Sequence, residues 1–138
     1  MKPEQFIRDF GEKKAREVVE WAPEGATHYG LRQYRQWEGR ILKTFTEGSW
    51  RSTAVFGGNL RFIEDDCLKI QDLKRLVESL DLVEKLGGYG KCKFYMTGMK
   101  LNKCDSVKCP KTGLIVSRAA LEIAINDYRE SIYGGGDA

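Results

Sequence analysis

Four cysteines and one histidine are the side chains with the widest chemical range in this chain of 138 residues. Cys104 and Cys109 form a C-x4-C pair, and Pro-Lys-Thr-Gly follows Cys109. A tight turn after a cysteine is typical of a metal knuckle, where backbone N–H groups point at the thiolate. Cys92, with either Cys67 or His28, could complete the four ligands of a structural zinc site. The spacings differ from those of common C-x2-C pairs, so unliganded thiols are favoured, and we predict no metal and no cofactor.

A catalytic role would depend on the single histidine. His28 lies in a predicted strand with no nucleophile motif nearby, which is typical of a partly exposed strand residue. The stretch 87–92 is similar to a phosphate loop, but Lys85 and Cys92 stand where that motif requires Gly and Ser or Thr. The acidic run 64–66 precedes a predicted helix, where carboxylates favour the helix dipole. We therefore predict that the chain is not an enzyme.

Basic and aromatic side chains interleave between residues 28 and 62, where six basic residues stand against two acidic ones. Aromatic and arginine side chains anchor protein interfaces when they lie outside the core. The candidates for partner binding are Tyr34, Arg35, Trp37, Arg40 and Trp50. Alternatively, cations and aromatic platforms bind single-stranded nucleic acid. The candidates for that role are Arg32, Arg35, Arg40, Lys43, Arg51 and Arg61. A half-exposed sheet is also polar on its outer face without any ligand.

The hydrophobic spacing predicts an α+β fold, with a small antiparallel sheet of three to four strands packed against three or more helices. We expect helices at about 3–21, 72–86 and 117–133. We expect strands within 27–63, near 27–36, 40–46 and 50–56, with a possible fourth at 60–63. Residues 88–112 are predicted to be a basic, cysteine-containing loop region.

Punctuating residues mark where these elements begin and end. Pro3 suits a first helical turn, and Gly11 should break or bend the first helix. Asp72 and Ser117 are the predicted N-caps of the later helices, and Gly87 ends the second. Nine helix-stripe positions are expected to share one core: Phe6, Phe10, Val18, Leu76, Leu80, Val83, Leu121, Ile125 and Tyr128.

Length and composition favour one domain spanning residues 1–138, because this is a common domain size. No apolar run approaches the roughly 20 residues that span a bilayer, and no apolar signal core follows the first residues. We therefore expect a cytoplasmic protein without a membrane partner, whose cysteines stay reduced.

Several short strings carry a resemblance. They are Pro-Glu-Gln-Phe-Ile-Arg at 3–8, Lys-Ala-Arg-Glu-Val-Val-Glu at 14–20, Ala-Pro-Glu-Gly-Ala-Thr-His-Tyr at 22–29, Gly-Ser-Trp at 48–50, Leu-Val-Glu-Lys-Leu-Gly-Gly at 82–88 and Glu-Ser-Ile-Tyr-Gly-Gly at 130–135. The chain resembles small early-region accessory proteins of temperate phages and prophages of enteric bacteria. The resemblance implies action in the host cytoplasm by binding a host or phage macromolecule. We expect a non-enzymatic protein binder with a regulatory or counter-defence role; the alternative is a nucleic-acid binder, possibly stabilised by zinc.

Overall fold

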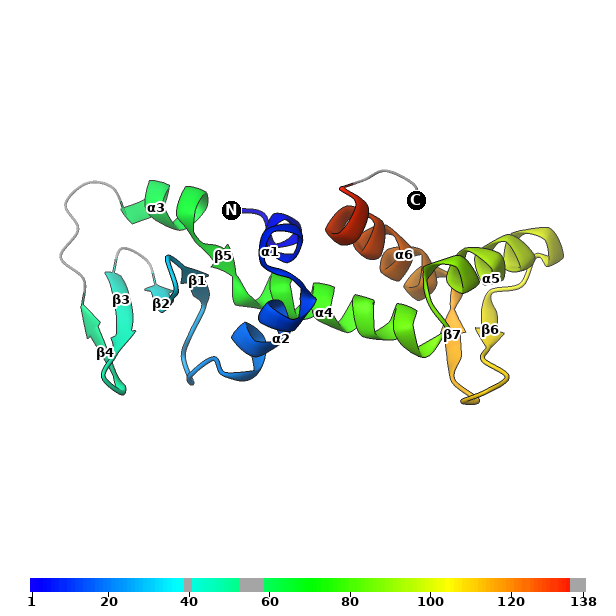
Figure 1. Ribbon diagram of the computed structural model, residues 1–138, viewed down its shortest axis with the longest axis horizontal. Coiled ribbons are helices and arrows are strands. Elements are labelled where there is room, and N and C mark those ends of the chain that lie inside the picture. Colours follow the sequence, from blue (N-terminus) through cyan, green and yellow to red (C-terminus); the bar gives the residue numbers. More distant parts are fainter. Residues whose placement is uncertain (39–40, 53–58, 135–138) are drawn as a thin grey trace. The chain divides into compact units, whose positions relative to one another are not determined.

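The computed structural model describes residues 1–38, 41–52 and 59–134 (Figure 1). Its contacts divide the chain into two compact units, Met1–Arg75 and Leu76–Ala138, and the division falls inside helix α4 (Ile70–Lys85). Helices and antiparallel sheets occur together, so the predicted α+β class is confirmed. The prediction of a single domain is not tested by this division and stays a prediction.

Two short helices, α1 (Pro3–Phe10) and α2 (Glu12–Glu20), open the first unit. Pro3 occupies the first turn of α1. Proline lacks an N–H, but N–H groups in the first turn have no acceptor within the helix, so no hydrogen bond is lost. Gly11 separates the helices with a φ of +91°, in the left-handed region that favours glycine. The predicted break at this glycine is confirmed.

The first unit contains a five-stranded antiparallel sheet in the order β4-β3-β2-β1-β5. Its strands are β1 (His28–Gly30), β2 (Gln33–Glu38), β3 (Ile41–Thr46), β4 (Ser49–Ser52) and β5 (Leu68–Lys69). Cross-strand neighbours share a face, so Arg35 and Thr44 lie on the face opposite to Tyr29 and Tyr34. On the Arg35 face a small buried cluster joins the sheet to helix α3 (Asn59–Asp66); its members are Leu42, Ile63 and Cys67, with Trp37 and Phe62 packed against them.

Three predictions about this sheet need correction. The predicted first strand at 27–36 is two strands, because a turn at 31–32 reverses the chain. The possible fourth strand at 60–63 is wrong, since these residues belong to α3. The fifth strand, β5, was not predicted because two residues are too short to show an alternating pattern. The last part of the strand predicted at 50–56 lies outside the described residues.

The second unit contains the C-terminal part of α4, helices α5 (Tyr89–Asn102) and α6 (Arg118–Tyr133), and a hairpin of β6 (Ser106–Lys108) and β7 (Ile115–Ser117). Figure 1 shows α5 and α6 beside this hairpin. The buried core of the unit consists of Val83, Leu86, Tyr89, Cys92, Met96, Met99, Cys109, Val116, Leu121, Ala124 and Ile125.

The predicted loop region at 88–112 is wrong over most of its length, because 89–102 forms α5. Ser117 is the N-cap of α6, as predicted, and its side chain accepts a hydrogen bond of 3.1 Å from the backbone N–H of Ala120. Asp72 lies inside the first turn of α4 and is not its N-cap. Gly87 follows the end of α4 with a φ of +103°, so the predicted glycine stop is confirmed.

The stripe positions predicted to form the core are mostly buried. Phe6 and Val18 are buried in the first unit, and Leu121 and Ile125 are buried in the second. Phe10 contradicts the prediction, because 59% of its surface is exposed. Phe10 lies one turn after Phe6 and is the last residue of this eight-residue helix. Its side chain therefore extends past the end of the buried face. No helix in the described part of the chain is long and apolar enough to cross a bilayer.

Candidate binding pocket in the first unit

The cysteines that could have bound zinc are not gathered by the fold. In the second unit, Cys92 is buried in the core, Cys104 is exposed and Cys109 is buried after β6. None of them belongs to a group of three ligand atoms within 4.8 Å among the described residues. The predicted tight turn does exist. The Thr112 hydroxyl and the backbone N–H groups of Thr112 and Lys111 donate to the Cys109 sulfur and lower the pKa of its thiol.

His28 has a structural place in the sheet. It is buried, contrary to the partly exposed position predicted, and its Nδ1 lies 2.8 Å from the Thr27 hydroxyl. Burial, followed by the nearby Lys69 ammonium, lowers the pKa of His28. A buried histidine with a lowered pKa is neutral at pH 7, so it stabilises the fold in its uncharged form.

The five residues predicted to anchor a partner are largely committed to internal contacts. Tyr34 donates from its hydroxyl to the Val18 carbonyl at 2.6 Å, and burial raises the pKa of Tyr34 to about 12. Arg35 is buried, donates to the Thr44 hydroxyl at 2.8 Å and lies over the Phe62 ring.

The two tryptophans in this group are half-buried. Trp50 donates from its indole N–H to the Glu24 carbonyl at 3.1 Å, and its ring packs edge-on against Phe45. Trp37 packs beside the small cluster beneath α3. Arg40 lies outside the described residues. These contacts hold the sheet together.

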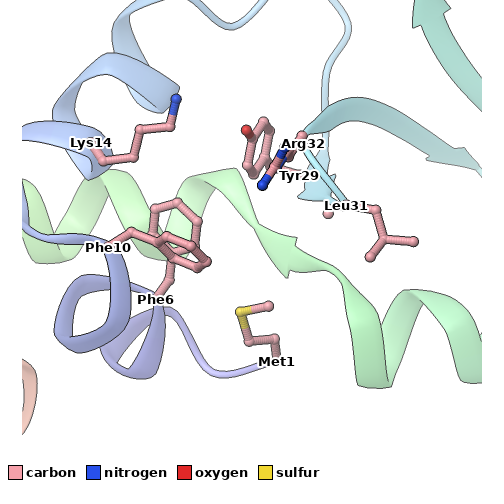
Figure 2. Close-up of a pocket in the computed structure, with 8 residues that line it drawn as sticks. Met1, Phe6, Phe10, Lys14, Tyr29, Leu31 and Arg32 are labelled. Carbon is pink, nitrogen blue, oxygen red and sulfur yellow. The ribbon is translucent and has the colours of Figure 1, made fainter.

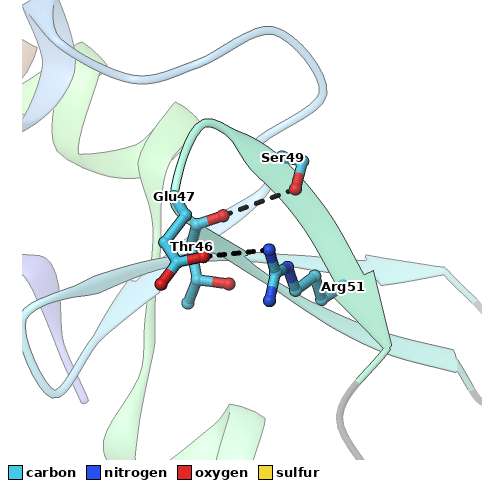
Figure 3. Close-up of polar contacts among 4 residues, drawn as sticks. All are labelled: Thr46, Glu47, Ser49 and Arg51. Atoms are coloured by element: carbon cyan, nitrogen blue, oxygen red, sulfur yellow. Dashed lines mark hydrogen bonds and ion pairs between the residues drawn. The ribbon is translucent and has the colours of Figure 1, made fainter.

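Of the six cations predicted to bind nucleic acid, the five that lie within the described residues do not share one surface. Lys43 lies on the sheet face opposite to buried Arg35. Arg51 is exposed but is paired with Glu47 at 3.0 Å across the β3–β4 turn, as Figure 3 shows. Arg61 is exposed on α3, and Arg32 is exposed in the β1–β2 turn. The arrangement offers no continuous row of cations over the described strands.

A cavity of about 610 Å³ lies in the first unit. It is lined by Met1, Phe6, Phe10, Lys14, Tyr29, Gly30, Leu31 and Arg32 (Figure 2). Figure 2 shows the α1 aromatics on one side and the β1–β2 turn residues on the other. Its volume and mainly apolar lining are those of sites that bind small molecules or the anchor side chains of a protein partner.

Aromatic rings form the apolar wall of this cavity. The ring centroids of Phe6 and Phe10 are 4.8 Å apart, and Phe6 meets Tyr29 edge-on at 5.9 Å. Tyr29 in turn packs edge-on against Tyr34 at 5.1 Å. Phe6 and Tyr29 are buried in this wall, whereas the ring of Phe10 is exposed at its edge.

The opposite side of the cavity depends on an unusual turn. Gly30 pairs with Gln33, which leaves Leu31 and Arg32 as a two-residue hairpin turn with φ angles of +52° and +63°. Such turns favour Asn or Gly, because other side chains are strained in the left-handed region. Leu31 is nevertheless 66% exposed at this strained position. Strain of this kind is concentrated at functional sites.

Gly30 explains how the strand comes close enough to form this wall. A Cβ atom at Gly30 would lie 2.5 Å from the Asp66 carbonyl oxygen and 2.6 Å from the Cys67 sulfur. Only glycine allows β1 to pass so near the end of α3. The neighbouring turn therefore has a defined position against the end of α3.

The charges around the cavity are of one sign. Lys14 and Arg32 are the charged side chains among its lining residues, and both are exposed cations. The lining contains no carboxylate, thiol or imidazole that could act as a general base or nucleophile. The arrangement can hold an apolar group with an adjacent negative charge.

The sequence predicts other roles for the members of this pocket. Phe6 and Phe10 are predicted for the core, Arg32 for nucleic-acid binding and Leu31 for a strand. The sequence contains one signal, since the alternation of Tyr29 and Leu31 breaks after Arg32, where Tyr34 and not Gln33 is the next apolar residue. No glycine or asparagine marked that turn.

No protein-family model, curated protein or solved structure matches this chain. The pocket is therefore interpreted from its own geometry alone.

Proposed function

We propose that the chain is a non-enzymatic, phage-type accessory protein that binds a host or phage protein through the aromatic pocket of its first unit. The observation that carries this proposal is the pair of exposed apolar side chains, Phe10 and Leu31, on opposite sides of a 610 Å³ cavity. Exposed aromatic and aliphatic side chains beside a cavity are the usual anchors of protein interfaces. The partner supplies an apolar side chain that fills the cavity and an acidic group that meets Lys14 or Arg32.

Capture of a partner from host lysate tests this proposal. The bait is the purified chain, the lysate is treated with nuclease, and bound proteins are identified by mass spectrometry. We expect one reproducible protein partner that is lost with Phe10→Ser and with Leu31→Ser, because each change removes an apolar wall of the pocket.

Leu60→Ser is the matched control. Leu60 is as exposed as Phe10, at 59%, and lies in the same unit but does not line the pocket. If Leu60→Ser also loses capture, the loss in the pocket variants is due to general surface hydrophobicity and not to the pocket. Capture that persists in both pocket variants would contradict the proposal, provided that circular dichroism shows all three variants to be folded.

Nucleic-acid binding is the alternative proposal. It draws support from the exposed cations Arg32 and Arg61 and from the basic stretch 28–62. Phosphate contacts release counterions, so such binding must weaken steeply as salt rises. A gel shift that is lost in Arg32→Ala with Arg61→Ala, and that weakens with salt, would favour this alternative over protein binding.

A further inference from the structure

Helix α5 in the second unit has two apolar faces. Its inner face carries Tyr89, Cys92, Met96 and Met99, all buried in the core of the unit. On the outer side, Phe94 and Leu101 are 71% and 78% exposed. A helix covered on one side is normally polar on the other. The outer apolar residues of α5 therefore need an explanation.

These outer residues form one stripe together with two glycines. Successive residues turn by about 100° around a helix, so positions four, eight and eleven apart return to the same side. Gly90, Phe94, Gly98 and Leu101 have this spacing. The stripe lies opposite the buried side chains and runs along most of the helix.

The glycines leave open space on either side of the Phe94 ring. A Cβ atom at Gly90 or at Gly98 would meet nothing within 4 Å. Glycine inside a helix is less favourable than alanine, and no neighbour in the structure requires it at these two positions. Small residues on an outward stripe allow another helix to approach closely, and two glycines flanking Phe94 form the two hollows beside a central ridge.

The charged side chains of α5 are all positive. Lys91, Lys93 and Lys100 are exposed on α5, and residues 89–102 contain no aspartate or glutamate. A second copy of α5 would bring like charges together, which disfavours self-association through this face. Lipid surfaces and nucleic acids are also anionic, but neither requires the hollows at the glycines.

We infer that the outer stripe of α5, Gly90–Phe94–Gly98–Leu101, is a docking surface for an acidic amphipathic helix of a partner protein. Phe94 and Leu101 insert between apolar side chains of the partner helix, and that helix places its own side chains in the hollows at the glycines. Its carboxylates pair with the lysines beside the stripe. This surface is in the second unit and does not depend on the pocket proposed above.

A designed peptide of about 21 residues, the length of α5 plus two turns, tests this inference. Leucines form its apolar stripe and glutamates flank them, and a twin peptide carries lysine in place of every glutamate. Binding of the fluorescein-labelled peptides to the full chain is measured by anisotropy. We expect the glutamate peptide to bind, the lysine twin not to bind, and about a tenfold loss of affinity in Phe94→Ala with Leu101→Ala.

Gly98→Leu distinguishes helix docking from simple attraction between charges. Because the position is open, this variant should fold and melt no lower than the natural chain, yet fill the hollow and weaken binding by about tenfold. Ile123→Ala, at an exposed apolar residue of α6, should bind as the natural chain does. Unchanged affinity in Gly98→Leu would overturn the inference. So would equal binding of the two peptides, no binding of either, or stronger binding to anionic phospholipid vesicles or to single-stranded DNA.

Discussion

Leu31 and Arg32 combine strain with exposure in one two-residue turn. Replacing them with Asn and Gly would supply the residue types that this turn favours. We predict that Leu31→Asn with Arg32→Gly stabilises the chain by about 1–3 kcal/mol, because strain in the left-handed region is relieved. The same variant should lose partner capture, since both side chains line the pocket. Urea denaturation and the lysate assay measure the two effects.

A second two-residue hairpin turn within the described residues provides the control for this trade-off. Glu47 and Gly48, between β3 and β4, have φ angles of +51° and +78°, and neither lines the pocket. Figure 3 shows Glu47 in this turn. Glu47→Asn should relieve strain at the first position and leave partner capture unchanged. Its exposed ion pair with Arg51 contributes little to stability. If both turn variants gain stability and neither loses capture, the first turn has no role in binding.

Gly30 and Gly98 should respond to alanine in opposite directions. At Gly30 the added methyl group would collide with backbone and sulfur atoms of the α3 end, so we predict a loss of at least about 1–3 kcal/mol. At Gly98 the methyl group meets open space within a helix, and we predict a gain of up to about 1 kcal/mol. Chemical denaturation of the two single variants checks both signs, and a stabilising Gly30→Ala would mean that β1 is placed wrongly against α3.

Among the helices, α4 and α6 are joined by a buried hydrogen bond in the second unit. Ser79 donates from its hydroxyl to the Asp127 carboxylate at 2.6 Å, and both side chains are buried. We predict that Ser79→Ala lowers stability by about 1–3 kcal/mol, because a buried carboxylate loses a donor. Ser117→Ala removes the exposed cap of α6 and should lower stability by about 1 kcal/mol. Thermal unfolding of both variants compares the two losses.

Elements with one apolar stripe were predictable from the sequence, and elements without one were not. The α6 helix has a capping serine and a single buried face, so its range 117–133 was close to the observed Arg118–Tyr133. The α5 helix carries apolar residues on both sides, contains two glycines and begins without a side-chain cap. Its periodicity is therefore weak, and the same glycines that suggested a loop are those of its outer stripe.

The candidate site was harder to predict, because side-chain type does not determine which face of a sheet is covered. Tyr34 and Arg35 have the chemistry of interface anchors, but α2 and α3 lie against the two faces that hold them. Phe10 has the spacing of a core residue but lies at the end of a short helix. Exposure here depends on tertiary packing, which a periodic pattern does not contain.

For the whole molecule, the buried ionisable groups predict how stability changes with pH. The lowered pKa of His28 means that the unfolded chain takes up its proton first as pH falls. Its contribution to stability is therefore complete above about pH 6.5, the usual histidine value, and is lost as pH falls below it. Burial raises the pKa of Cys67 and of Cys92 to about 11, so the unfolded chain loses these protons first as pH rises. Their contribution is lost progressively above about pH 8.5.

We therefore predict a stability maximum between about pH 6.5 and 8.5, measured as the urea midpoint under reducing conditions across pH 5 to 10. His28→Asn, which keeps a polar group near the Thr27 hydroxyl but does not titrate, should flatten the acid limb. Cys67→Ala and Cys92→Ala should each flatten the alkaline limb, while Cys104→Ala, at the exposed cysteine, should leave it unchanged. The comparison is between slopes, because each alanine also lowers stability at every pH by removing a buried sulfur. The urea midpoint could instead fall equally steeply above about pH 8.5 in the natural chain and in both buried-cysteine variants. That result would show that these thiols are already ionised or solvated in the folded chain.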